Sequence, residues 1–237
     1  MNIYRVQEGV NKLINKINSR RIYYLRKGEI GINLGSDIET IPSFVGIDGS
    51  FLIFMMKSFL PKFVKKSFYK KTWANKNYSF EDYFKKVKSI RIIHFDLSYG
   101  IPFKKESLQF IFTSHFLEHL AEETARILLK DCFRVLKKGG IMRIIVPDFD
   151  EEIKLIVDKI KKYKKNNSTA ELQEYLTVPK HHSEFGFHKR IYNFKELKSI
   201  LEKSGFRKIV RRKLHQGKLP ELKKLDLKKG LIIEAEK

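Results

Sequence analysis

The sequence predicts an α/β fold built on a mostly parallel, doubly wound sheet. Short runs of almost continuous apolar residues alternate with longer segments of helical periodicity, which is typical of strands buried on both faces between helices. The first two apolar runs end on Gly35 and Asp48, a glycine turn and a carboxylate of the kind found where such strands end. We expect strands at 29–34, 44–48, 90–95, 108–113, 141–146, 206–210 and 231–236.

The connection between the first two strands is unusually short. Only Gly35 to Ser43 lies between them, which is less than an average helix of ~11 residues. A parallel pair normally needs a crossover of a dozen or more residues. We therefore expect the crossover helix to be reduced to about one turn.

The helical segments are expected at 2–24, 51–60, 80–87, 121–136, 149–163 and 194–203. The first is amphipathic and is expected to pack its apolar face on the sheet edge, or else to cover a ligand site; that face comprises Val6, Val10, Leu13, Ile14 and Ile17. Lysines and glycines at 137–140 predict the end of the helix at 121–136, and Asn193 predicts a capped start for the last helix. The last two strands are expected to pair antiparallel at the sheet edge.

Length and composition predict one domain over residues 1–237, with an N-terminal helix in 1–28 and an insertion at 51–89. The single cysteine, Cys132, excludes a disulfide framework and suits a reducing, cytoplasmic setting. We expect no signal peptide and no membrane span, because the longest apolar run is far below about 20 residues. The net charge of +22 suits nucleic acid or anionic lipid as partners, or reflects lysine-rich compositional drift.

The insertion at 51–89 is the least ordinary segment. It contains ten lysines against two acids, with aromatic residues between them, and Pro61 interrupts any helix that runs through it. One interpretation is a pair of helices packed on the sheet with lysines outward. The other is an interfacial element for a nucleic acid or for an anionic membrane, which would make the protein membrane-peripheral.

Four segments, in order, resemble the class I S-adenosylmethionine-dependent methyltransferases, and most closely their type 11-like, small-molecule or glycan-pathway members. These segments are 29–48, 94–103, 110–120 and 134–148, and the resemblance extends over roughly 29–206. It implies a Rossmann-like, seven-stranded, mostly parallel sheet with an antiparallel last strand. It also implies methyl transfer to a small-molecule or sugar-type acceptor, with S-adenosylmethionine as cofactor.

The residues of the expected cofactor site follow the strand ends. Asp48, with Gly49 beside it, can accept hydrogen bonds from a ribose diol. The resemblance implies backbone contacts to the methionine end of the cofactor and contacts to its adenine and sulfonium; the residues concerned are Asn33, Leu34, Gly35, Asp96, Leu97 and Ser114. The chain departs from the usual Gly-x-Gly at Ser36-Asp37, where the Asp37 carboxylate could repel the cofactor's carboxylate or hold its ammonium group.

Candidates for a general base on the acceptor side are His115, His119, His181, His182 and His188, and the resemblance favours His188. A metal site from His181, His182, Glu184 and His188 is disfavoured, because adjacent histidines on an extended chain do not easily reach one ion. A nicotinamide dehydrogenase is disfavoured because the turn lacks G-x-G-x-x-G. The alternative to an enzyme is a catalytically degenerate relative that uses its basic surface to bind nucleic acid or an anionic membrane. A nucleic-acid methyltransferase ranks third, because no N-P-P-Y-like motif or nucleophilic cysteine motif is present.

Overall fold

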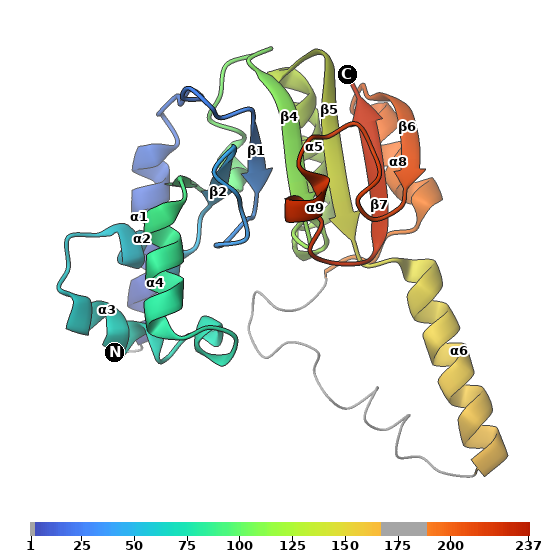
Figure 1. The fold of residues 1–237 in the computed structure, drawn as a ribbon, viewed down its shortest axis with the longest axis horizontal. Helices are drawn as coiled ribbons and strands as arrows, with labels where there is room; N and C mark the ends of the chain where they lie inside the picture. Colours follow the sequence, from blue (N-terminus) through green and yellow to red (C-terminus); the bar gives the residue numbers. More distant parts are fainter. Residues whose placement is uncertain (1–2, 167–188) are drawn as a thin grey trace.

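The computed structural model describes residues 3–166 and 189–237, and its centre is one seven-stranded sheet (Figure 1). The strand order is β3-β2-β1-β4-β5-β7-β6. Only β7 runs antiparallel to its neighbours β5 and β6, so the predicted mixed, Rossmann-like sheet is confirmed. The strands are β1 Gly31–Leu34, β2 Phe44–Asp48, β3 Ile92–His94, β4 Leu108–Ser114, β5 Leu136–Val146, β6 Arg207–Arg212 and β7 Leu231–Glu236.

One face of the sheet is covered by two helices, α5 Glu122–Val135 and α8 Phe194–Lys203. Their apolar stripes pack on strand residues that point to this face and form the largest core cluster, including Ile32, Val45 and Ile144. The side chain of Asn193 accepts a hydrogen bond from the Glu196 N–H at 2.9 Å, which confirms the predicted cap of α8. Cys132 is completely buried in this core.

The opposite face is covered differently. No helix lies between β1 and β2, as the short connection predicts. Instead the connection between β6 and β7, which includes the short helix α9 Leu222–Leu225, lies over this face of the sheet (Figure 1). Leu219, Leu222 and Leu225 pack there on apolar strand residues such as Phe44 and Phe112. The β6–β7 connection thus covers the sheet face that has no helix because the β1–β2 connection is short.

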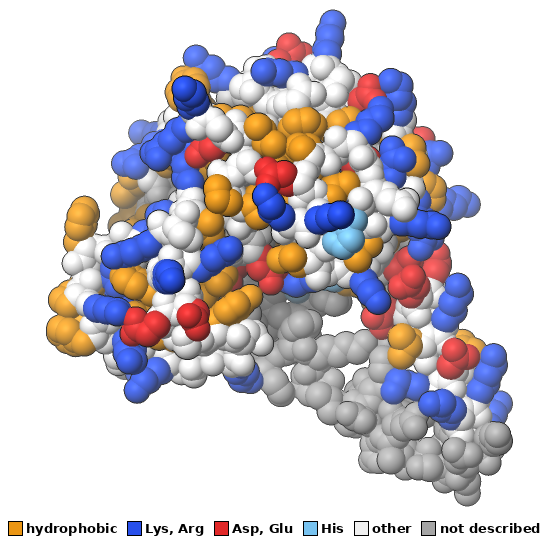
Figure 2. Space-filling view, in the orientation of Figure 1, with side chains coloured by type: hydrophobic (Ala, Val, Ile, Leu, Met, Phe, Trp, Pro, Cys, Tyr) orange, Lys and Arg blue, Asp and Glu red, His pale blue; other side chains and the backbone are white. Residues whose placement is uncertain are grey.

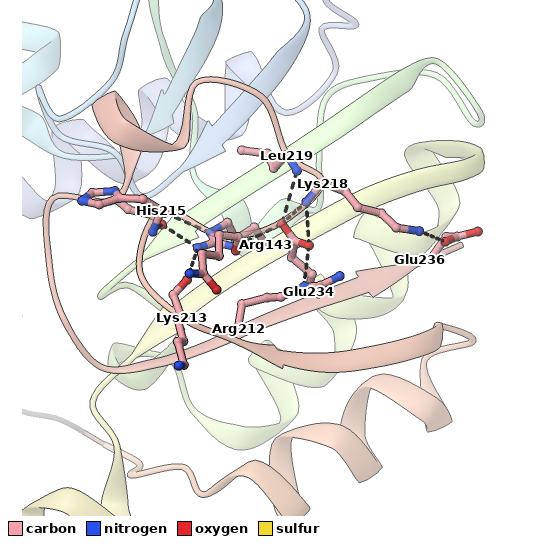
Figure 3. A network of polar contacts seen from close by, with 10 residues as sticks. Arg143, Arg212, Lys213, His215, Lys218, Leu219, Glu234 and Glu236 are labelled. Carbon is pink, nitrogen blue, oxygen red and sulfur yellow. Dashed lines mark hydrogen bonds and ion pairs between the residues drawn. The ribbon is translucent and has the colours of Figure 1, made fainter.

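A buried ionic network holds this connection on the sheet (Figure 3). Arg143 on β5 is fully buried and makes a bidentate contact with Asp226, with Nε–Oδ1 at 2.9 Å and Nη2–Oδ2 at 2.5 Å. Its Nη1 donates to Glu234 Oε1 at 3.0 Å and to the Gln216 carbonyl at 3.0 Å. The register of β5 and β7 places Arg143 opposite Glu234, so the sheet itself aligns this pair.

The N-terminal helix α1, Ile3–Asn18, is oriented opposite to our prediction. Its asparagines face the protein: Asn11 Nδ2 donates to the Gly49 carbonyl at 3.0 Å, and Asn15 is 2% exposed. Val10, Leu13 and Ile17 are instead 42%, 61% and 58% exposed. The prediction that this apolar face packs on the sheet edge was therefore wrong.

The insertion forms a small helical layer beside β3. Its elements are α2 Phe51–Lys57, α3 Lys62–Tyr69, the 3₁₀ turn η1 Trp73–Lys76 and α4 Phe80–Ser89. The buried aromatic rings of Tyr69 and Tyr83 form a second core with Ile38 and Ile92. Helices packed with lysines outward are thus what the structure shows, with Lys65 as a buried exception at 5% exposure.

The strand β5 begins earlier than the sequence predicts, directly after α5. Helix α5 stops at Val135 because Leu136 takes an extended conformation and begins β5, so Lys137–Gly140 belongs to the strand. Helix α6, Phe149–Asn166, projects away from the sheet (Figure 1). Among the described residues no helix is both long enough and apolar enough to cross a membrane.

Candidate cofactor and acceptor site

The candidate site lies where the sheet reverses its winding. β1 is hydrogen-bonded to β2 on one side and to β4 on the other, so chain connections leave this point in opposite directions. In open α/β sheets, ligands bind at the carboxyl ends of the strands at such a switch point. Gly35 directly follows β1, Asp48 and Ser114 are the last residues of β2 and β4, and Asp96 lies two residues after β3.

Asp48 joins two loops at this edge. Its Oδ2 accepts the Asp37 N–H at 2.8 Å and its Oδ1 accepts the Ser50 N–H at 2.8 Å. Each carboxylate oxygen keeps further acceptor capacity, because an ionised carboxylate offers about four lone-pair sites. A Cβ on Gly49 would lie 3.0 Å from the Asp96 Cα, a tight contact, so glycine favours the close approach of these two strand ends.

The glycine turn is covered by an aromatic ring. Gly35 has φ +62°, a conformation that favours glycine, and a Cβ there would lie 2.1 Å from Phe116 Cδ2. The Gly35 N–H donates to the Ile47 carbonyl at 2.9 Å. The Asn33 side chain donates to the Glu39 carbonyl at 2.7 Å, and Leu34 is buried. The Gly35 amide and the Asn33 side chain therefore serve the fold in this conformation.

Asp37 forms an unexpected link between this turn and the insertion. Its backbone is left-handed, with φ 42°, and its Oδ1 accepts a hydrogen bond from the Tyr83 hydroxyl of α4 at 2.5 Å. Burial, followed by the negative charge of Asp48, raises the pKa of Asp37 to about 7. The same carboxyl, together with burial, raises the pKa of Tyr83. Near neutral pH the turn therefore holds a titrating carboxyl.

The expected adenine side is formed by the end of β3. Asp96 Oδ1 accepts the Ser98 N–H at 2.9 Å and so caps the 3₁₀ turn η2, Leu97–Tyr99. Leu97 is 6% exposed and belongs to the main core. Capping uses one oxygen of Asp96 and leaves the other free of the cap. The structure thus places both residues at the predicted edge, with Asp96 as the polar group.

The acceptor side follows β4. His115, with φ 50°, places Nε2 3.1 Å from the Lys229 carbonyl and Nδ1 3.3 Å from Glu118 Oε1. Glu118 lies in the 3₁₀ turn η3, Leu117–His119, and is completely buried. Neither of its carboxylate oxygens has a hydrogen-bond partner among the described residues. His119 lies at the end of the same turn, whereas His188 lies outside the described residues.

Two residues of the site carry no clear signal in the sequence. Tyr83 is 46 positions from its partner Asp37, and only the packing of the insertion brings them together. Phe116 reaches Gly35 because β1 and β4 are neighbours in the sheet, which becomes visible only once the strand order is known.

A metal centre was disfavoured from the sequence. Over residues 3–166 and 189–237 no group of three or more histidine, cysteine or acidic side chains is placed to hold an ion. The histidines at 181, 182 and 188 and Glu184 lie outside those residues, so the structure does not test the candidate that they form.

Comparison with known proteins gives one family match. Residues 64–144, less than half of the chain, match the model of the methyltransferase domain. No curated protein matches the sequence. The sheet order is that of a Rossmann-like fold, and within it residues 64–144 are similar to a methyltransferase domain.

Solved structures resemble the chain more weakly. A SAM-dependent methyltransferase from Archaeoglobus fulgidus is 18% identical, with a TM-score of 0.47 and full coverage of both chains. A possible histamine N-methyltransferase from Thermotoga maritima is 16% identical, with a TM-score of 0.44 and coverage of 99% of this chain and 94% of that one. These values are too low to assign an acceptor.

The residues at the sheet edge fit the two halves of S-adenosylmethionine unequally. The nucleoside half is matched by Asp48 and Asp96, whose carboxyl groups lie at neighbouring strand ends and offer hydrogen-bond acceptors. On the methionine half, the Phe116 ring lies against Gly35 and Asp37 adds a carboxyl. The Phe116 ring therefore covers the side of the turn where the sequence places the methionine end.

Proposed function

We propose that the chain transfers a methyl group to a small-molecule or sugar-type acceptor and that His115 and Glu118 serve the acceptor side. The observation that carries this proposal is the completely buried Glu118 carboxylate, with no hydrogen-bond partner among the described residues, 3.3 Å from His115 Nδ1. A buried carboxylate without a partner is costly, so its retention beside a histidine at the switch point favours a role in proton transfer.

The geometry of the pair assigns separate roles to the two ring nitrogens. Nδ1 faces the Glu118 Oε1 atom at 3.3 Å, so this carboxylate can orient the ring. Nε2 faces the Lys229 carbonyl at 3.1 Å, and an acceptor that replaces this carbonyl could pass its proton to Nε2. S-adenosylmethionine supplies the methyl group as a sulfonium. Glu118 then positions the ring and stabilises its charge.

A small, mostly polar cavity lies near Gly35. A cavity of about 10 Å³ lies there between β1, β4 and the segment around α9, and it can hold at most about one water molecule. It is lined by amide, hydroxyl and carboxylate groups and by apolar side chains, from Asn33, Ser36, Glu39, Ser114, Phe112, Leu225 and Leu227. A cavity of this size is too small to hold an acceptor molecule in this conformation.

The test separates cofactor binding from transfer. His115→Ala and Glu118→Gln are compared with wild type by calorimetric titration with S-adenosylmethionine and by methyl transfer to a panel of amines, phenols and sugar nucleotides. We expect the cofactor Kd to stay within about threefold while kcat falls about 10²-fold or more, the usual contribution of a general base. Lys130→Ala, on the exposed surface of α5, is the control. Unchanged kcat in His115→Ala would contradict the proposed role.

The second candidate function is a methyltransferase-shaped binding protein that acts through its basic surface. The Phe116 ring over Gly35 and the acid at Asp37 favour it, since both lie on the expected methionine side of the cofactor. No binding of S-adenosylmethionine or S-adenosylhomocysteine up to millimolar concentration in calorimetry would support this candidate. Micromolar binding would exclude it.

The Phe116 ring also gives a prediction that distinguishes a covered site from a lost one. If the ring must move before the cofactor binds, the cost of moving it weakens the apparent affinity. Phe116→Ala should then tighten S-adenosylmethionine binding, by about tenfold if the open conformation is a minor one. Phe149→Ala, a phenylalanine 37% exposed at the start of α6, should leave the affinity unchanged. Equal affinities for Phe116→Ala and wild type would mean that the ring does not control entry.

A further inference from the structure

The turn between α2 and α3 presents large apolar side chains to solvent. Phe59 is fully exposed at 108%, Phe63 is 74% exposed and Leu60 is 42% exposed, and Pro61 lies between them. Scattered single apolar residues are normal on a surface, but a cluster of this size usually marks an interaction site. We call the segment 59–63 the apolar tip.

The apolar tip is held in place by a buried lysine. Lys65 is 5% exposed, and its Nζ donates to the Met56 carbonyl at 3.1 Å and to the Ser58 carbonyl at 2.6 Å. These bonds fix the last turn of α2 and the residue that precedes Phe59. The exposure of the apolar tip is therefore maintained by a specific contact inside the insertion.

Basic side chains surround the apolar tip. Exposed lysines precede it and follow it along α2, α3 and the next turn: Lys57, Lys62, Lys66, Lys70 and Lys71. Lys62 is the member of this set that pairs with an acid, Glu81, at 2.6 Å in an exposed contact. Figure 2 shows hydrophobic side chains gathered at the end of the molecule that carries α3, with Lys and Arg around them. The surface thus combines protruding apolar side chains with positively charged ones.

A second apolar surface lies on the neighbouring helix. Helix α1 packs on α2 while Val10, Leu13 and Ile17 point outward, as described above. These residues recur at helical spacing and form a continuous stripe, and Lys12 and Lys16 on α1 are also exposed. Two adjacent helices thus leave apolar side chains uncovered among lysines.

We propose that the apolar tip and the α1 stripe are a contact surface for an anionic lipid bilayer. Phe and Leu side chains can enter the boundary between headgroups and acyl chains while lysines bind anionic headgroups. Single-stranded nucleic acid would be bound by stacking, for which the aliphatic members of the surface are unsuited. A second copy of this chain would bring its lysines against the same lysines. Charge complementarity therefore favours the bilayer, independently of the catalytic activity.

The experiment is co-sedimentation of the full chain with phosphatidylcholine vesicles, with and without phosphatidylglycerol, at low and high salt. Wild type should bind the anionic vesicles, and more weakly as salt rises. The variant Phe59→Ser/Leu60→Ser/Phe63→Ser should bind at least about tenfold more weakly. Removing Lys66, Lys70 and Lys71 by alanine substitution should weaken binding about fivefold for each lysine. Helix content and cofactor affinity should stay unchanged, because all these side chains are exposed.

Matched controls come from the opposite part of the molecule. Ile127→Ser/Val210→Ser removes apolar residues 52% and 40% exposed, and Lys137→Ala/Lys138→Ala removes exposed lysines of β5. Both should bind vesicles as wild type does. Equal binding of the Phe59 variant and wild type would overturn the proposal. The proposal would also be overturned if the wild type self-associates and the Phe59→Ser/Leu60→Ser/Phe63→Ser variant does not. That result would identify a second copy of the chain as the partner. Oligonucleotide binding that depends on the lysines, without vesicle binding, would identify a nucleic acid instead.

Discussion

At the scale of the residue, Asp37 couples the stability of the protein to pH. Its pKa is raised from 3.8 to about 7, so the folded state favours the protonated carboxyl. A group raised in this way contributes stability that is complete below the unfolded pKa and is lost as pH rises through the folded value. Asp37→Asn is neutral at every pH and keeps an acceptor for Tyr83. It should be more stable than wild type at pH 8, by about 2 kcal/mol after solvent screening, and equal to it below about pH 4.

Urea unfolding followed by circular dichroism at several pH values measures this difference. Asp150→Asn, an exposed acid on α6, is the control and should show no pH-dependent gain. Parallel stability profiles for Asp37→Asn and wild type would contradict a raised pKa at Asp37. The expected result is a gain in the stability of Asp37→Asn over wild type that begins above about pH 4, grows towards pH 7 and then levels off.

The sequence could predict Asp37 as unusual because it stands where the resembling proteins have glycine. It could not predict what the carboxyl meets, because Tyr83 comes from an insertion whose packing has no counterpart in the resemblance. Asp48 and Gly35 were predictable, since strand ends and a glycine with φ +62° follow from local pattern. His115 was predicted as a base, whereas its contacts with Glu118 and the Lys229 carbonyl depend on the tertiary fold.

At the scale of the element, Arg143 holds the β6–β7 connection on the sheet. Replacing it by methionine leaves the Asp226 side chain, 0% exposed, and the Glu234 side chain, 3% exposed, without their buried cation. Breaking such a pair from one side typically costs about 3–5 kcal/mol, because charges remain buried and uncompensated. We expect Arg143→Met to lose stability by this amount in urea unfolding.

Arg212→Met is the matched control, because Arg212 contacts the same Glu234 at 3.0 Å with a side chain that is 29% exposed. It should cost below about 1 kcal/mol. Adding Asp226→Asn and Glu234→Gln to Arg143→Met should recover part of the loss, since neutral partners carry no buried charge. Similar losses for Arg143→Met and Arg212→Met would mean that burial of the network does not set its contribution.

Periodicity predicted the existence of most helices better than their surroundings. The apolar residues of α1 do recur at helical spacing, but this spacing does not indicate which surface, if any, covers them. In the structure Asn11, Asn15 and Asn18 face inward instead. The end of α5 was predicted to within one residue, but the start of β5 was placed too late because the lysines and glycines after the helix resemble a helix cap. They begin a strand instead, since β5 pairs with β4 from Leu136.

At the scale of the whole molecule, the buried apolar runs predicted the strands, and the resemblance predicted how they are combined. The short crossover, Gly35 to Ser43, was the weakest point of that prediction, because it left open what covers one sheet face. The β6–β7 connection covers this face. Its leucines lie more than 170 positions after Ile41 of the β1–β2 connection and share a core cluster with it. Contacts at that sequence distance have no local signal.

The single-domain prediction can be tested through the insertion. Ile38 and Ile92 belong to the same core as Tyr69 and Tyr83, and the Tyr83–Asp37 hydrogen bond joins α4 to the glycine turn that follows β1. The insertion should therefore unfold together with the sheet.

The chain has one tryptophan, Trp73, within the insertion, whereas circular dichroism reports all helices. We expect the fluorescence and dichroism transitions in urea to coincide, as in a two-state protein. Tyr83→Phe should shift both transitions to lower urea together, because it removes the link without dividing the core. A fluorescence transition that precedes the dichroism transition would show instead that residues 51–89 form a separate folding unit.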